Sequence, residues 1–118
     1  MPKSSKKKPS AGPFSIRIGK AVLKQIRLAS LREGGTPSAW IRDVALMRAE
    51  AVLEGKKALE ELEELPYEKS DGGEKQGVWL DSKQLKQITT AAHREGFVIG
   101  SWIRAVAAQR AKMVMGKG

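Results

Sequence analysis

The sequence predicts a small α+β domain, mostly helical, in which two copies of a strand-helix-helix unit form one core. Two observations lead to this prediction. The chain repeats itself at an offset of 62 residues, and within each copy the apolar residues change from alternation to helical spacing. A length of 118 residues suits one compact domain with tails, and 41% hydrophobic residues are enough for a core.

The repeat aligns residues 14–52 with residues 76–114 without a gap and contains 16 identities in 39 positions. Chance similarity between two amphipathic helices would not keep one offset through a turn and a tryptophan. The chain therefore contains a duplication. The longest matched blocks are Leu-Lys-Gln-Ile at 23–26 and 85–88, Arg-Glu-Gly at 32–34 and 94–96, and Trp-Ile-Arg at 40–42 and 102–104.

The first copy begins at residues 14–18, where apolar and polar residues alternate as in a half-buried strand. A helix follows and ends at Gly34-Gly35, because glycine readily adopts the left-handed conformation there. Thr36-Pro37 starts a second helix, since threonine is a good N-cap and proline suits the first helical position. The expected core residues are Phe14, Ile16 and Ile18 in the strand, Ala21, Val22, Leu23, Ile26, Ala29 and Ser30 in the first helix, and Trp40, Ile41, Val44 and Ala45 in the second.

The second copy repeats this order, and Gly96 ends its first helix. Val98 stands where the first copy has a threonine, so we expect Gly100 or Ser101 to supply part of the cap. The expected core residues are Gln76, Val78 and Leu80 in the strand, and Trp102, Ile103, Val106 and Ala107 in the second helix.

One copy alone cannot fold, because its strand has no partner and its two helices leave an apolar face open. Two copies can pair their strands antiparallel and interlock four helices beneath the ribbon. The sequence thus predicts one intertwined domain over residues 14–118. Its predicted parts are a disordered basic arm at 1–13, a first unit at 14–52, an acidic linker at 53–75 and a second unit at 76–118.

Charge is distributed unevenly along the chain. The sequence has 22 basic and 13 acidic residues, and nine of the acidic residues lie between Glu50 and Glu74. The rest carries 19 basic and 4 acidic residues, a net charge of +15 on 93 residues. Such a basic body is expected to attract polyanions, first nucleic acid and second an anionic membrane surface, with plain solubility as the alternative. The acidic segment is either a solvated face or a mask over the basic surface.

Residues for catalysis or metal binding are sparse. The absence of cysteine excludes disulfides, thiolate metal sites and a cysteine nucleophile, and His93 has no second histidine for a metal site. No phosphate-binding loop, dinucleotide fingerprint or nucleophile elbow occurs. No apolar run approaches the roughly 20 residues of a membrane span, and the N-terminal lysines precede no apolar signal region. We expect a cytoplasmic protein that is not an enzyme and uses no cofactor.

The order of these features resembles the ribbon-helix-helix superfamily of DNA-binding proteins, the Arc/MetJ type. The resemblance covers about two thirds of the chain. Most members of that superfamily are homodimers. Two copies in one chain resemble the single-chain pseudodimers among the accessory proteins of conjugative DNA transfer, such as the TraY type. The matching residues are 14–18, 23–34 and 36–42 in the first copy, and 78–80, 85–96 and 100–104 in the second.

The resemblance implies that the ribbon enters the major groove of DNA and that the polar phase of each strand reads bases. In the first copy these residues are Ser15 and Arg17, and Arg17 is the best candidate for a bidentate guanine contact. In the second copy they are Lys75, Gly77 and Trp79. Base contact and structural packing are equally open for Trp79, and a slip of the strand register is a further alternative.

The resemblance also implies that the N-terminus of each second helix binds a DNA phosphate. Besides these, Lys3, Lys6, Lys7 and Lys8 either follow phosphates or the minor groove, or only keep the chain soluble. Trp40 and Trp102 are expected to anchor the core. The expected phosphate-binding residues are Thr36, Ser38 and Ala39 in the first copy, and Gly100, Ser101 and Trp102 in the second.

The implied function is sequence-specific binding of double-stranded DNA at an asymmetric site, since Ser15/Arg17 and Gly77/Trp79 present different chemistry. By resemblance, the protein is expected on a bacterial plasmid or nucleoid as a monomeric pseudodimer. There it would help assemble a DNA-transfer complex, the relaxosome, with a relaxase as partner. The alternatives are a transcriptional repressor of the same type, a protein-interaction module that has lost base reading, and a membrane-surface protein.

Overall fold

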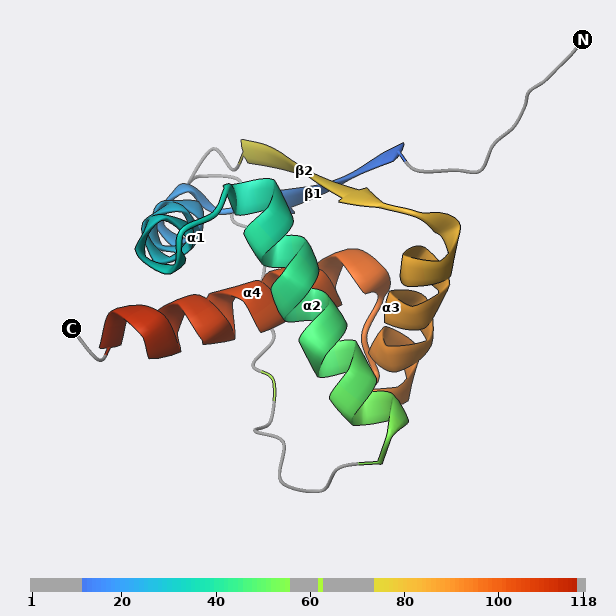
Figure 1. Cartoon of the computed structure of the whole chain (residues 1–118). Helices are drawn as coiled ribbons and strands as arrows, with labels where there is room; N and C mark the ends of the chain where they lie inside the picture. The colour runs from blue at the N-terminus through green and yellow to red at the C-terminus, as the bar shows by residue number, and fades with distance from the viewer. Residues whose placement is uncertain (1–11, 56–61, 63–73, 117–118) are drawn as a thin grey trace, which may run out of the picture.

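The computed structural model describes residues 12–55, 62 and 74–116. In this part of the chain, two strands pair antiparallel and four helices lie on one side of the resulting ribbon (Figure 1). The fold is therefore a small, mostly helical α+β structure, as the sequence predicted. The elements are β1 (Gly12–Ile18), α1 (Lys20–Glu33), α2 (Pro37–Leu53), β2 (Glu74–Leu80), α3 (Ser82–Arg94) and α4 (Ile99–Gly116).

The ribbon is centred on two equivalent residues of the repeat. Ser15 lies opposite Gly77, and these residues are 62 positions apart. Exchanging the two copies therefore maps every cross-strand pair onto another pair of the same ribbon. For example, Arg17 opposite Lys75 maps onto Trp79 opposite Pro13. The two strands are thus related by an approximate two-fold axis through the centre of the ribbon.

The burial of the strands follows their alternation. Ile16 and Ile18 in β1 and Val78 and Leu80 in β2 are all buried against the helices. Because Val78 and Leu80 keep the expected core phase, Trp79 does not mark a slip of the register. Strand β2 begins at Glu74, so the last two residues assigned to the acidic linker belong to the ribbon.

Each second helix packs against the other copy. Helix α2 packs against α3 and β2, and α4 packs against α1 and β1. Figure 1 shows α2 crossing α4 beneath the ribbon, with α1 and α3 at opposite ends. The two copies therefore share one core, and neither can leave without exposing its apolar residues to water.

The core is close to the expected one. Trp40 and Trp102 are buried, with 6% and 0% of their surfaces exposed, which confirms their role as core anchors. Ala21 is exposed, and the buried positions of α1 are Leu23, Ile26, Ala29 and Ser30. The expectation for Ala21 was wrong because the helix is rotated toward the Leu23 side, and an exposed alanine costs little.

Candidate nucleic-acid interface

One face of the ribbon, opposite the helices, carries the residues expected to read bases. We call it the outer face. Its six register positions are Pro13, Ser15, Arg17, Lys75, Gly77 and Trp79. Ser15, Arg17, Lys75 and Trp79 are exposed, and none of the six positions holds an acidic residue. The antiparallel register thus brings residues from both copies of the repeat onto one surface.

The side chain at Trp79 does not serve the core. The residue is 55% exposed, in contrast to Trp40 and Trp102. Packing against the described helices therefore does not account for this tryptophan. A large exposed indole on the same face of the ribbon as two exposed cations is a surface for a ligand or partner.

The first turn of α2 is capped by its own threonine. The Oγ1 of Thr36 accepts the N–H of Ala39 at 3.3 Å, and its carbonyl oxygen accepts the N–H of Trp40 at 2.8 Å. The amide of Ala39, expected to bind a phosphate, is therefore engaged by the cap. Ser38 lies in the first turn, where N–H groups have no acceptor within the helix.

Helix α4 starts at the same place in the repeat as α2, because Ile99 corresponds to Pro37. The expectation that Gly100 or Ser101 would cap this helix was therefore wrong: both lie inside its first turn. Gly100 lies beside Ile16 of β1, and a Cβ atom there would be at an ordinary contact distance of 3.9 Å from the Cγ2 of Ile16.

The amide of Trp102, also expected to bind a phosphate, is engaged within the helix. Its N–H donates to the carbonyl oxygen of Val98 at 2.9 Å, and its side chain is fully buried. The hydroxyl of Ser101 accepts a hydrogen bond from Nη2 of Arg104 at 3.3 Å. The other guanidinium nitrogen of Arg104, Nη1, donates to the carbonyl oxygen of Arg17 at 2.9 Å. This arginine thus ties the start of α4 to strand β1.

A polar contact in each copy, which sequence reasoning missed, holds the end of one helix to the next. The Nε1 of Trp40 donates to Glu33 at 2.7 Å, and the Nε1 of Trp102 donates to Glu95 at 2.9 Å. Both residues of each pair are identical in the two copies. The identity of both the glutamate and the tryptophan in the two copies was therefore the signal that could have revealed these contacts.

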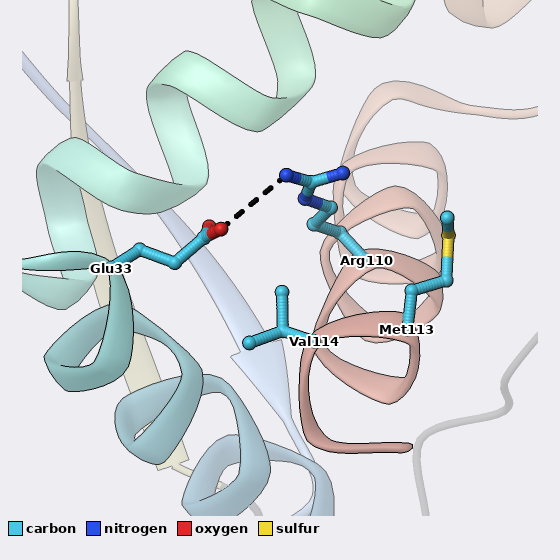
Figure 2. Close-up of a pocket in the computed structure, with 4 residues that line it drawn as sticks. All are labelled: Glu33, Arg110, Met113 and Val114. Carbon is cyan, nitrogen blue, oxygen red and sulfur yellow. Dashed lines mark hydrogen bonds and ion pairs between the residues drawn. The ribbon is translucent and has the colours of Figure 1, made fainter. Parts of the chain in front are cut away.

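An arginine from the other copy completes each of these sites. Arg48 forms a bidentate pair with Glu95, with distances of 3.0 Å from Nε and 2.6 Å from Nη2. Arg110, the equivalent residue, contacts Glu33 through a single 3.4 Å pair (Figure 2). Arg48 is 8% exposed in its side chain and Arg110 is 37% exposed. The two equivalent ion pairs therefore differ in burial and geometry.

The looser pair borders a small pocket of about 190 Å³. Its lining residues are Glu33, Arg110, Met113 and Val114, from α1 and α4 (Figure 2). The Nε of Arg110 is buried there without a hydrogen-bond partner among the described residues. The pocket is part of the imperfect packing around this ion pair.

The acidic residues outside the segment from Glu50 to Glu74 are used in local contacts. Glu33 and Glu95 accept the tryptophan and arginine contacts described above. Asp43 pairs with Arg42 at 3.2 Å. Asp81 caps α3 by accepting the N–H of Gln84 at 2.7 Å. None of these four carboxylates lies on the outer face.

The environment of Glu95 changes its acidity. Burial alone would raise the pKa of this carboxyl. The hydrogen bonds from Arg48 and Trp102, together with the charge of Arg48, outweigh burial. The pKa of Glu95 therefore lies below its ordinary value of 4.5.

This lowered pKa predicts a loss of stability in acid. The stabilisation from the Glu95 carboxylate is fully present above about pH 4.5 and is lost as the pH falls through the lower pKa of the folded protein. We expect the free energy of unfolding of the wild type and Glu95→Gln to differ at pH 7 and to converge below pH 4.5. Urea unfolding at a series of pH values measures the free energy of unfolding of both proteins. A difference independent of pH would contradict the assigned role of the carboxylate.

Comparisons of the chain with protein-family models, with curated proteins and with solved structures give no match. Within residues 12–55, 62 and 74–116, no helix is both long and apolar enough to cross a bilayer. The same residues contain no group of three or more His, Asp or Glu side chains placed to hold a metal ion. The four lysines of the expected basic arm lie outside the described residues.

Proposed function

We propose that the protein is a sequence-specific double-stranded DNA-binding protein of the ribbon-helix-helix type. The observation that carries this proposal is the outer face of the ribbon. Its residues Ser15, Arg17, Lys75 and Trp79 are exposed, and none of its six positions is acidic. Hydrogen-bond donors, cations and an indole on one narrow surface suit the edges of DNA bases.

The dimensions of the ribbon favour the major groove. Seven residues in each strand span about 23 Å, and the strands lie about 4.8 Å apart. The major groove is about 12 Å wide and admits a two-stranded ribbon.

The helix N-termini are placed to support such a complex. Helix α2 packs on β2 and α4 packs on β1, so the first turn of each second helix belongs to an element that touches the ribbon. Such turns bind phosphates through their amides and the helix dipole. Ser38 in α2 and Gly100 and Ser101 in α4 are the remaining candidates, since the amides of Ala39 and Trp102 are engaged.

The duplication and the basic N-terminus favour a role in plasmid transfer. We infer that the protein acts in the bacterial cytoplasm as an accessory factor of the relaxosome, with a relaxase among its partners. The same interface would serve a transcriptional repressor. The position of the binding site decides between them: a site at a transfer origin supports the first role, and a site in a promoter supports the second.

A second candidate of another class is a protein-interaction module. The exposure of Trp79 favours it, because exposed tryptophan is enriched at protein interfaces. Gly77 adds no side chain for base reading at the centre of the ribbon.

Selection from random duplex DNA at two salt concentrations tests the proposal. We expect enrichment of a defined motif at both concentrations. The logarithm of the affinity should fall against the logarithm of salt by about 0.9 for each phosphate contact. Strongly salt-dependent binding without a motif would contradict base reading, and the interaction module would then be favoured.

A further inference from the structure

The two ends of the outer face carry different chemistry. At one end Arg17 lies directly opposite Lys75, and the exchange of copies maps this pair onto Trp79 and Pro13 at the other end. Like charges directly opposite each other destabilise a ribbon. One end therefore carries two cationic residues opposite each other, while the equivalent end presents an indole.

The residues that follow the strands increase this difference. Lys20 begins α1, and Ser82 begins α3 at the equivalent place. Gly19 precedes α1 without a side-chain cap, whereas Asp81 caps α3 with an exposed carboxylate. We call the end with Arg17, Lys75 and Lys20 the cationic end, and the end with Trp79 and Asp81 the indole end.

Glu74 precedes Lys75 in β2 but does not share its face of the ribbon. It lies opposite Ile18, in the phase that faces the helices. Its carboxylate is 3.5 Å from the guanidinium of Arg27. Among the described residues, Arg17 and Lys75 are therefore the charged positions of the outer face at this end.

We propose that the ribbon binds DNA in a single orientation, with the cationic end over a guanine and the indole end over a thymine. This inference rests on the proposed function. Guanine offers two acceptors in the major groove, O6 and N7, which Arg17 matches with a bidentate contact beside Lys75. Thymine offers its C5-methyl group, an apolar contact that the indole of Trp79 matches.

The spacing between the two ends sets the spacing of the bases. Lys75 and Trp79 are four residues apart on β2, which corresponds to about 13 Å along the strand. At about 3.4 Å for each base pair, this distance spans roughly four base-pair steps. The guanine and the thymine are therefore expected about four base pairs apart in one motif.

Reciprocal variants test the orientation directly. Trp79→Arg places an arginine at the position equivalent to Arg17, and Arg17→Trp does the reverse. In selection from random duplexes, we expect Trp79→Arg to enrich guanine in both halves and Arg17→Trp to enrich thymine in both halves. Both substitutions lie on the exposed outer face, and circular dichroism of each variant verifies that it is folded.

Modified bases test the same contacts atom by atom in the selected duplex. Replacing the thymine by deoxyuridine removes its methyl group, and we expect a roughly three-fold loss of affinity for the wild type and none for Trp79→Ala. Replacing the guanine by 7-deazaguanine removes its N7 acceptor. We expect a roughly ten-fold loss for the wild type and none for Arg17→Ala.

The possible results separate this inference from the proposed function. A wild-type motif that is palindromic, or one that Trp79→Arg leaves unchanged, overturns the single orientation while base reading stands. The absence of any wild-type motif overturns base reading, and the inference fails with it. An asymmetric motif that becomes symmetric in both reciprocal variants supports the inference.

Discussion

Arg48→Ala is expected to lower the free energy of unfolding by about 3 kcal/mol. The guanidinium of Arg48 is buried and holds both oxygens of Glu95, which also accepts the indole N–H of Trp102. Removing it leaves a carboxylate in a partly buried site without its counter-charge. Urea unfolding followed by circular dichroism measures the loss.

The duplication supplies a matched control for this experiment. Arg110→Ala removes the equivalent guanidinium, which makes one longer contact and is more exposed. We expect a loss below about 1 kcal/mol, as for exposed ion pairs. Equal losses for the two variants would show that the difference in burial between the two sites has no energetic consequence.

Arg17→Ala is expected to reduce affinity for the selected duplex by about 10- to 100-fold and to leave affinity for unrelated duplexes nearly unchanged. A bidentate arginine contact to guanine contributes about 1–3 kcal/mol of discrimination, while phosphate contacts contribute equally to all sequences. Fluorescence anisotropy with the selected and a scrambled duplex measures both affinities.

Arg94→Ala is the control for the loss of one positive charge. Arg94 ends α3, whose first turn follows the ribbon, and 13 residues of helix place it about 20 Å further away (Figure 1). We expect less than about a two-fold change on either duplex. A loss from Arg17→Ala that is equal on both duplexes would assign Arg17 to phosphate rather than base contact.

The repeat and its periodicities were sufficient to predict the elements and their pairing. An offset of 62 residues identified the equivalent residues, and alternation in residues 14–18 identified the core phase that the structure confirms. Gly34 and Gly96 end helices as expected, with φ angles of 87° and 83°. These features are local, so the sequence contains them directly.

Features that depend on contacts between the copies could not be predicted in this way. Leu23 and Leu85 belong to identical blocks, yet Leu23 is fully buried and Leu85 is 38% exposed. Likewise, the side chain of Arg48 is more buried than that of the equivalent Arg110. The burial of a residue depends on its neighbours from the other copy, and those neighbours are not identical.

The start of α4 shows the same limit for the candidate interface. Capping preferences placed the first turn too late, because Val98 is a poor cap by its side chain. In the structure the N–H of Trp102 donates to the carbonyl oxygen of Val98, and α4 begins directly after this valine. A preference for a capping side chain is a weak local signal that the rest of a fold commonly overrides.

Because the interlocked copies belong to one chain, their association is intramolecular. A linker of this length holds two partners at an effective concentration on the order of millimolar. A dimer of separate chains loses its folded state on dilution, whereas the folded fraction of this chain is independent of its own concentration. Even at nanomolar concentration in a cell, each molecule would therefore keep its two strands paired.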